Sequence, residues 1–286
     1  MFGSAFKELF TPALQPLLQT VKQHLFNRDY AAAFGVKRNL EGYVVRWSPS
    51  RALCYTEVFM GMCGEVAEVF DLRKGWEGED RSRREVVCIG GGAGAEVVAV
   101  AAAVGRFLRR NGEEEGGKSE RGLHVTAIDI ADWTPIIDTL RTGLTSSSFI
   151  SPSTYSVTFH HHDILSTPSP PPTLLPPNTS LITLLFTTNE LYAQSRGDTT
   201  RFLLSLSALT HVGCLLLVLE SAGSYSTVEI NGKMFPMGML LDHTLLSGEW
   251  EIVFKDESRW HRLPEGLKYP IDLENMRYFV RVYRRV

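Results

Sequence analysis

A glycine-rich turn formed by Gly90, Gly92 and Gly94 has the clearest chemical potential in this sequence. The apolar run 86–89 precedes the turn, and a segment rich in alanine and valine with helical spacing follows it. This order predicts a strand, a tight turn and a helix, and the glycines let a ligand approach the backbone amides at the helix start. In open α/β sheets, such a turn after the first strand commonly holds a nucleotide-like cofactor.

Acidic residues stand near the ends of three further predicted strands, at Asp129, Asp163 and Glu190. The carboxyl ends of parallel strands meet at one edge of a sheet, so these side chains are expected close to the glycine turn. A carboxylate at Asp129 could accept hydrogen bonds from both hydroxyls of a ribose. It could instead cap a helix that begins near residue 132.

The sequence predicts a helical region at 11–70 and alternating strands and helices from residue 86 onward, and these elements would position the residues named above. The first five predicted strands are continuous apolar runs typical of strands covered on both faces, whereas the last two alternate and predict an antiparallel pair joined by a long loop. The strands are predicted at 86–90, 123–129, 155–160, 181–188, 212–220, 250–255 and 277–285, and the main helices at 94–110, 132–141, 198–210 and 236–246. In the N-terminal region, Ser48 or Ser50 is expected to cap a second helical segment, with Pro49 in its first turn.

The composition of the chain fits a globular protein with a sizeable core, since 44% of its 286 residues are hydrophobic and the net charge is −3. The four cysteines form no Cys-x-x-Cys pair and are expected to be buried free thiols in a reducing compartment. No signal peptide is apparent and no apolar run could span a bilayer, so we expect a soluble intracellular protein without a membrane partner. The consecutive histidines at 160–162 would point to alternate faces of a strand, so no metal site is expected.

Five parallel strands followed by an antiparallel pair resemble the class I S-adenosylmethionine (SAM) dependent methyltransferases over residues 86–286. The resemblance implies an α/β, Rossmann-like fold with a seven-stranded, mostly parallel sheet and a terminal antiparallel hairpin. It also implies a methyltransferase domain at 81–286 preceded by a helical extension at 1–80.

The same resemblance implies SAM as the cofactor and assigns its contacts. The turn formed by Gly90, Gly92 and Gly94 would pass beneath the amino acid part of SAM, Asp129 would bind the ribose, and Asp163 would accept from the adenine amino group. The sequence departs from many class I members at Cys88, where an acidic residue is common. Glu96 could hold the methionine ammonium in its place.

Four longer motifs together resemble the fungal family of large-subunit (25S) ribosomal RNA uridine-N3 methyltransferases. They are RWSPSRALCY at 46–55, GAE at 94–96, TNELY at 188–192 and ESAGSYS at 220–226. This resemblance implies ribosomal RNA or a pre-ribosomal particle as the partner, and a location in the nucleus, nucleolus or cytoplasm. Two alternatives remain open at this point: methylation of a small metabolite or protein side chain, and a non-catalytic subunit that binds a partner.

The chemistry of uridine-N3 methylation would need a base, because N3 carries a proton and is a poor nucleophile while it does. Glu190 is the best-placed candidate, although it could instead stabilise the start of a helix. Asn189 could orient the base edge, and Tyr192 could stack on an extruded uracil or pack in the core. Arg46 and Arg51 could bind the SAM carboxylate or an RNA phosphate, or could be paired within the protein.

Overall fold

The computed structural model describes residues 1–27, 29–72, 83–110, 122–146, 149–166, 170–171, 173–223, 227–230 and 232–286. These residues contain a seven-stranded sheet with the order β3-β2-β1-β4-β5-β9-β8 and a separate two-stranded hairpin, β6-β7. The strands of the large sheet are β1 (Arg83–Ile89), β2 (Gly122–Asp129), β3 (Tyr155–His161), β4 (Thr179–Leu185), β5 (Leu215–Ser221), β8 (Trp250–His261) and β9 (Met276–Arg285).

The strand pairing confirms the predicted topology. Strand β1 lies between β2 and β4 and is parallel to both. The chain therefore continues from β1 to one side of the sheet and later returns to the other side, and a crevice forms between β1 and β4 at their carboxyl ends. Strand β9 is antiparallel to both β5 and β8, which makes β8 and β9 the expected terminal hairpin. The short strands β6 (Thr227–Ile230) and β7 (Lys233–Pro236) were not predicted, because four residues are too few to show a period.

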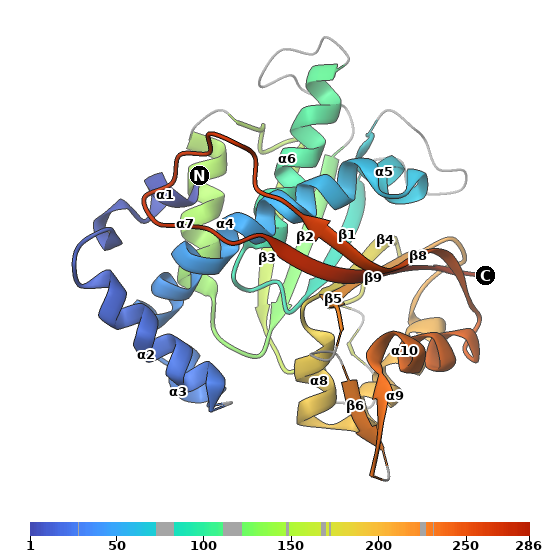
Figure 1. The fold of residues 1–286 in the computed structure, drawn as a ribbon. Coiled ribbons are helices and arrows are strands. Elements are labelled where there is room, and N and C mark those ends of the chain that lie inside the picture. Colours follow the sequence, from blue (N-terminus) through green and yellow to red (C-terminus); the bar gives the residue numbers. More distant parts are fainter. Residues whose placement is uncertain are drawn as a thin grey trace.

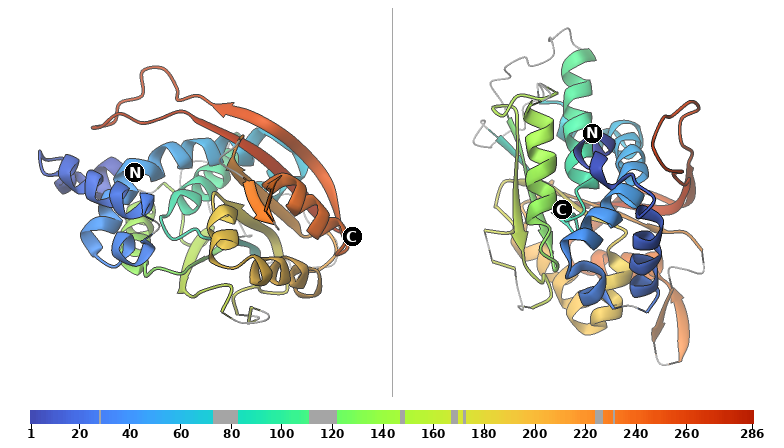
Figure 2. Two further views of the ribbon diagram at one scale, coloured as in Figure 1. Left: turned by 60° about the horizontal axis from the view of Figure 1, so that its bottom comes forward. Right: turned by 90° about the vertical axis from the view of Figure 1, so that its left-hand side faces the viewer.

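The helices fall into two groups, one on each side of the sheet (Figures 1 and 2). The first group precedes β3 in the chain and the second follows β4. The first comprises α1 (Phe2–Ala5), α2 (Leu14–Phe26), α3 (Tyr30–Phe34), α4 (Lys37–Gly61), α5 (Gly64–Phe70), α6 (Ala95–Arg110) and α7 (Thr134–Ser146), with a 3-10 turn at Lys7–Leu9. The second comprises α8 (Thr188–Gln194), α9 (Arg196–Leu209) and α10 (Met237–Leu246).

Each face of the sheet has its own hydrophobic core. Val86 and Cys88 of β1 belong to the core that includes α1, α2 and α4–α7, whereas Val87 and Ile89 belong to the core beneath α8–α10. Successive strand residues point to opposite faces, so burial on both faces requires the continuous apolar runs seen in the sequence. The N-terminal helices share the first core with the sheet. The proposed domain boundary after residue 80 falls outside the described residues.

Helix α4 corrects the prediction of a helix that begins near Ser48 or Ser50, because it runs without interruption from Lys37 to Gly61 with Pro49 inside it. Proline has no N–H for the carbonyl of the residue four positions earlier, which here is Val45. The hydroxyl of Tyr269 donates to that carbonyl at 2.9 Å. A residue from the loop between β8 and β9 therefore replaces the missing helix hydrogen bond. Figure 1 shows this loop crossing in front of α4.

Strand β4 ends at Leu185, so residues 186–188 are not part of the strand predicted at 181–188. The chain turns at Phe186, which has a φ of 60°, and then enters α8. A positive φ is unusual for an aromatic residue and marks a strained turn. The N–H of Phe186 donates to the carbonyl of Leu219 at 2.7 Å, which ties the turn to the neighbouring strand β5.

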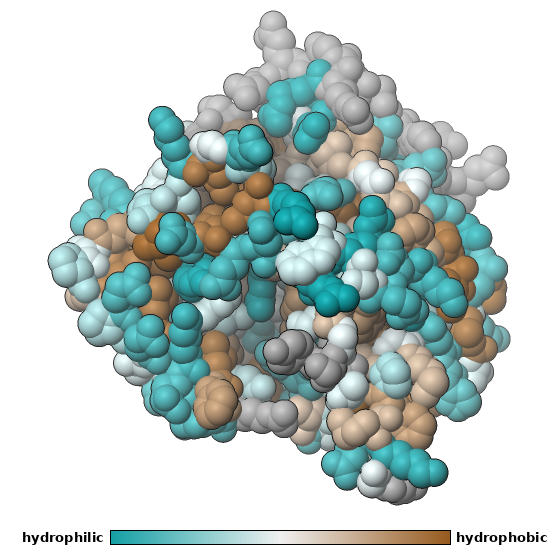
Figure 3. Space-filling model, in the orientation of Figure 1, coloured by the Kyte–Doolittle hydropathy of each residue, from teal (hydrophilic) through white to brown (hydrophobic). Residues whose placement is uncertain are grey.

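The surface and the cysteines agree with the composition. Hydrophilic residues separate the hydrophobic areas over the face shown in Figure 3. All four cysteines are free and buried, as predicted. Within the described part of the chain, no helix is both long enough and apolar enough to cross a membrane.

Candidate active site

A cavity of about 450 Å³ lies at the carboxyl ends of β1, β2 and β4, beneath α3 and α4 and beside α8. This volume falls within the range of small-molecule sites. Aromatic and aliphatic side chains form most of the lining, and a few charged groups converge on it. The lining residues are Tyr30, Phe34, Tyr43, Arg51, Ile89, Gly90, Ala93, Ile128, Asp129, Ile130, Trp133, His162, Asp163, Ile164, Leu185, Phe186, Thr187, Glu190, Leu191, Ala193 and Gln194.

The glycine turn forms the floor of the cavity and requires glycine on steric grounds. Gly90 has a φ of 76°, and a Cβ there would stand 2.3 Å from the Thr187 hydroxyl oxygen. A Cβ on Gly92 would stand 2.0 Å from a ring carbon of Trp133. Gly90 lines the cavity directly, whereas Gly92 and Gly94 shape the turn beneath it.

Asp129, at the end of β2, lines the cavity and is held by the glycine turn. Its two carboxylate oxygens accept hydrogen bonds from the backbone N–H of Gly92 at 3.1 Å and of Ala131 at 3.0 Å. Burial raises the pKa of this carboxyl, and the two N–H donors partly offset the effect. Each oxygen keeps a lone pair that could accept from a ligand hydroxyl.

Asp163 follows β3 and lines the same cavity. One carboxylate oxygen accepts from the Leu165 N–H at 2.9 Å, and the other accepts from the side-chain amide of Gln194 at 2.8 Å. The second contact joins the β3 side of the cavity to α8. The structure therefore brings Asp129 and Asp163 into one site, as their positions after neighbouring strands predicted.

Glu190 lies in the first turn of α8 and faces the cavity, whose opening exposes its side chain to solvent. The surrounding protein wall desolvates the carboxyl and raises its pKa to about 7. The charge of Arg51 lowers this pKa, whereas the charges of Asp129 and Glu220 raise it. A carboxyl that titrates near neutral pH in a cavity has the properties of a general base.

Asn189 and Tyr192 are near Glu190 in sequence, but neither lines the cavity. The backbone N–H of Asn189 donates to the Glu220 carboxylate at 3.1 Å. Tyr192 is buried in the core beneath α8–α10. Their roles toward a substrate stay predictions, and for Tyr192 the core position corresponds to the alternative of simple packing.

Glu96 and Arg46 also lie outside the cavity lining. The carboxylate of Glu96 is buried beneath the glycine turn and accepts from the Thr183 hydroxyl at 2.6 Å. Burial raises the pKa of Glu96 to about 8. Arg46 forms an ion pair with Glu274 in the loop between β8 and β9. A cofactor contact by either residue stays a prediction.

The aromatic wall of the cavity was not predicted from the sequence. Tyr43 and Phe34 pack against the indole of Trp133, with ring centroids 5.7 Å and 5.1 Å away. Tyr43 and Arg51 line the cavity from α4, two helical turns apart on the same face. Their eight-residue spacing was the available signal, but it indicates a shared face only if the helix continues through Pro49.

The donor set suits a ligand that combines an adenosine with a charged amino acid. Asp129 and Asp163 offer acceptors, the aromatic wall offers an apolar surface, and the glycine turn leaves space that a Cβ at Gly90 would fill. The sequence profile of a family of SAM-dependent methyltransferases matches residues 2–284. The chain belongs to this family. It is an enzyme, and its cofactor is SAM.

Comparisons with individual proteins agree with the family. The chain is 38% identical over 287 aligned residues to the 25S rRNA (uridine(2843)-N(3))-methyltransferase of Saccharomyces cerevisiae, and the match covers 93% of this chain and 76% of the yeast protein. The structure of an O-methyltransferase family protein from Burkholderia thailandensis superposes with a TM-score of 0.52 at 14% identity, covering 96% of this chain and 70% of that one. The second match shows a shared class I methyltransferase fold.

The described residues contain no group of three or more histidine, cysteine, aspartate or glutamate side chains that could hold a metal ion. The described lining of the cavity includes Gly90, three acidic side chains, a single arginine, and several aromatic and aliphatic side chains.

Proposed function

We propose that this methyltransferase modifies N3 of a uridine in large-subunit ribosomal RNA. The observation that carries the proposal is the 38% identity, over 93% of the chain, to a yeast enzyme whose name specifies that reaction. The position of Glu190 supports it, because the reaction needs a base in the cavity. Ribosomal RNA or a pre-ribosomal particle would then be the partner, in the nucleus, nucleolus or cytoplasm.

The residues of the cavity suit the two requirements of the reaction. Bound SAM supplies an electrophilic methyl group on a sulfonium, so the protein must align the acceptor and remove its proton. The carboxylate of Glu190 would take the N3 proton as the methyl group is accepted. A pKa of about 7 leaves a substantial fraction of Glu190 ionised at neutral pH while keeping it basic enough for this step.

The shape of the cavity also suits a single extruded base. An RNA base must leave its stack to reach a reactive group inside a protein, and aromatic side chains commonly receive it. Tyr30 and Phe34 of α3 line the cavity on the side opposite the sheet and offer such a surface.

A complementation experiment in yeast tests this proposal. The chain would be expressed in a strain lacking the 38% identical relative, and methylation of uridine 2843 in 25S rRNA would be measured. Methylation of N3 blocks the pairing edge, so reverse transcription stops at the modified base, and nucleoside mass spectrometry quantifies it. We expect the wild-type chain to restore the modification and Glu190→Gln to fail at comparable expression. Absence of the modification with the wild-type chain, despite SAM binding in vitro, would contradict the proposed acceptor.

A further inference from the structure

Among the described residues that line the cavity, Arg51 is the one lysine or arginine, and it stands there with the acids Asp129, Asp163 and Glu190. It projects from the middle of α4. Its guanidinium lies 5.7 Å from the ring centroid of Tyr43 and 5.5 Å from that of Phe186. The two aromatic rings hold the planar group in place and favour its charge.

The hydrogen-bonding capacity of Arg51 is largely unused. One terminal nitrogen donates to the hydroxyl of Tyr43 at 2.7 Å. Among the described residues, the other nitrogens of this guanidinium have no hydrogen-bond acceptor, and no carboxylate lies within 4.0 Å. A guanidinium has five N–H donors in a fork that matches a carboxylate. Arg51 is half-buried, so its free donors are only partly hydrated and are available to an anionic ligand in the cavity.

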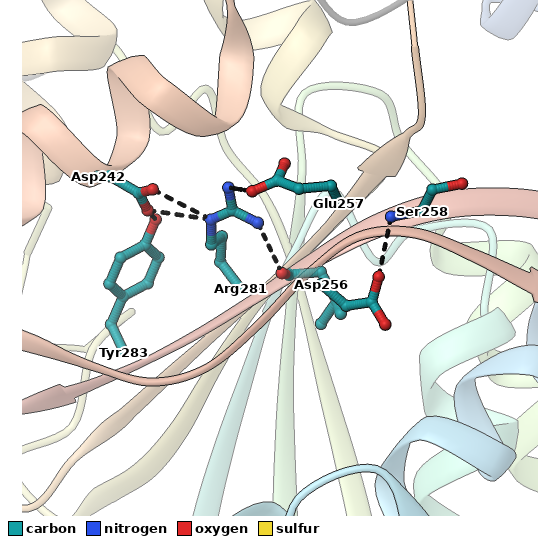
Figure 4. A network of polar contacts seen from close by, with 7 residues as sticks. Asp242, Asp256, Glu257, Ser258, Arg281 and Tyr283 are labelled. Carbon is teal, nitrogen blue, oxygen red and sulfur yellow. Dashed lines mark hydrogen bonds and ion pairs between the residues drawn. The ribbon is translucent and has the colours of Figure 1, made fainter.

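The three buried arginines of the described chain, unlike the half-buried Arg51, each have a carboxylate or several carbonyl groups as partners. Arg281 contacts Asp242 at 3.0 Å and Glu257 at 2.5 Å, and Figure 4 shows carboxylates on two sides of its guanidinium. Arg84 donates to three backbone carbonyls, each at 2.8 Å. Arg46 is paired with Glu274. Arg51 differs from all three because it lines the cavity and, among the described residues, pairs with a hydroxyl rather than with a carboxylate or a carbonyl.

We propose that Arg51 binds the α-carboxylate at the methionine end of SAM. That carboxylate is the anionic group of the cofactor, and Arg51 is the matching cation of the cavity lining. Arg51 also lies at the right end of the site: one turn before it on α4, the Ser48 hydroxyl donates to the carbonyl of Ala93 in the glycine turn at 2.8 Å. The inference depends on SAM binding and not on the identity of the methyl acceptor.

Ligand binding measured by calorimetry in the absence of RNA tests the assignment. The probes are SAM and decarboxylated SAM, which keeps the sulfonium and ammonium but lacks the carboxylate. We expect the wild-type enzyme to bind SAM about 10- to 150-fold more tightly, the factor typical of a hydrogen bond between charged groups. Arg51→Met should lose this preference, because its affinity for SAM falls while its affinity for decarboxylated SAM does not change. Arg51→Lys should retain part of the preference. Arg106→Met, at an exposed position on α6, is the matched control.

Each alternative result overturns the assignment. Equal affinity of the wild-type enzyme for the two ligands would show that no group binds the carboxylate, and this arm needs no variant to fold. Equal losses for both ligands in Arg51→Met would indicate a structural role. A loss of SAM preference in Arg46→Met but not in Arg51→Met would place the anchor at Arg46. If Arg51→Met bound SAM normally but transferred the methyl group to RNA more slowly, Arg51 would contact the methyl acceptor rather than SAM.

Discussion

Glu190 is the group on which the proposed reaction depends most directly, and its environment predicts a specific pH profile. With a pKa of about 7, about a tenth of the carboxyl is ionised at pH 6 and about nine-tenths at pH 8. The ionised form is the base, so the rate of methyl transfer should rise about tenfold between these pH values and then level off. Glu190→Gln keeps the size of the side chain but cannot accept the proton. It should lower the rate by about 10²- to 10⁴-fold and remove the rise.

Single-turnover transfer of a labelled methyl group from SAM to 25S rRNA, measured from pH 5.5 to 9, tests this reasoning. SAM affinity is measured at each pH, so that a change in binding is separated from a change in chemistry. Glu8→Gln is the matched control, because Glu8 lies in the N-terminal 3-10 turn with its side chain 87% exposed. A Glu190→Gln enzyme that keeps its rate within about threefold, or keeps the rise near pH 7, would refute the assignment of Glu190 as the base.

Three further predictions concern the cofactor site and the fold. Asp129→Asn should weaken SAM binding about 10- to 150-fold in calorimetry, whereas Asp138→Asn on α7 should not; equal affinities would remove the ribose role. The pKa of Glu96 is about 8 in the folded protein, against an ordinary value of 4.5. The folded state therefore holds the proton more tightly, and the free energy of unfolding falls as the pH rises from 4.5 to 8. At about 1.4 kcal/mol per pKa unit, the total loss is at most about 5 kcal/mol. Glu96→Gln should therefore stabilise the protein in urea unfolding at pH 9 but not at pH 4.5, and the same gain at both would contradict the burial argument. Tyr269→Phe leaves the Val45 carbonyl unpaired and should lower the free energy of unfolding by about 1–2 kcal/mol. The loss should be smaller in a Pro49→Ala background, which restores the helix N–H. Equal losses in both backgrounds would exclude this coupling.

Much of the scaffold was predictable from the sequence because its signals are local. Continuous apolar runs predicted the five parallel strands, since a strand buried on both faces has no polar side to expose. Gly90, Gly92 and Gly94 predicted a tight turn, and in the structure Gly90 and Gly94 have positive φ values of 76° and 75° there. Asp129 and Asp163 were placed correctly at one sheet edge because parallel strands align their carboxyl ends.

The errors came from positions where distant contacts override a local rule. Pro49 ordinarily favours a helix start, but Tyr269, 224 residues after Val45, supplies the hydrogen bond that lets α4 continue. The predicted strand at 181–188 overran because the apolar pattern gives no sign of the turn at Phe186. That turn depends on a backbone hydrogen bond to Leu219, in the next strand of the sheet.

The sequence by itself determined that this chain forms an open α/β sheet with a glycine turn and acidic residues at the strand ends. Those features follow from the period of apolar residues and from backbone preferences, which act over a few residues. Tertiary structure alone decided that α4 runs unbroken over the cavity and that Arg51 faces it without an anionic partner among the described residues. Whether a charge is paired depends on which distant segments meet, and sequence spacing does not report that.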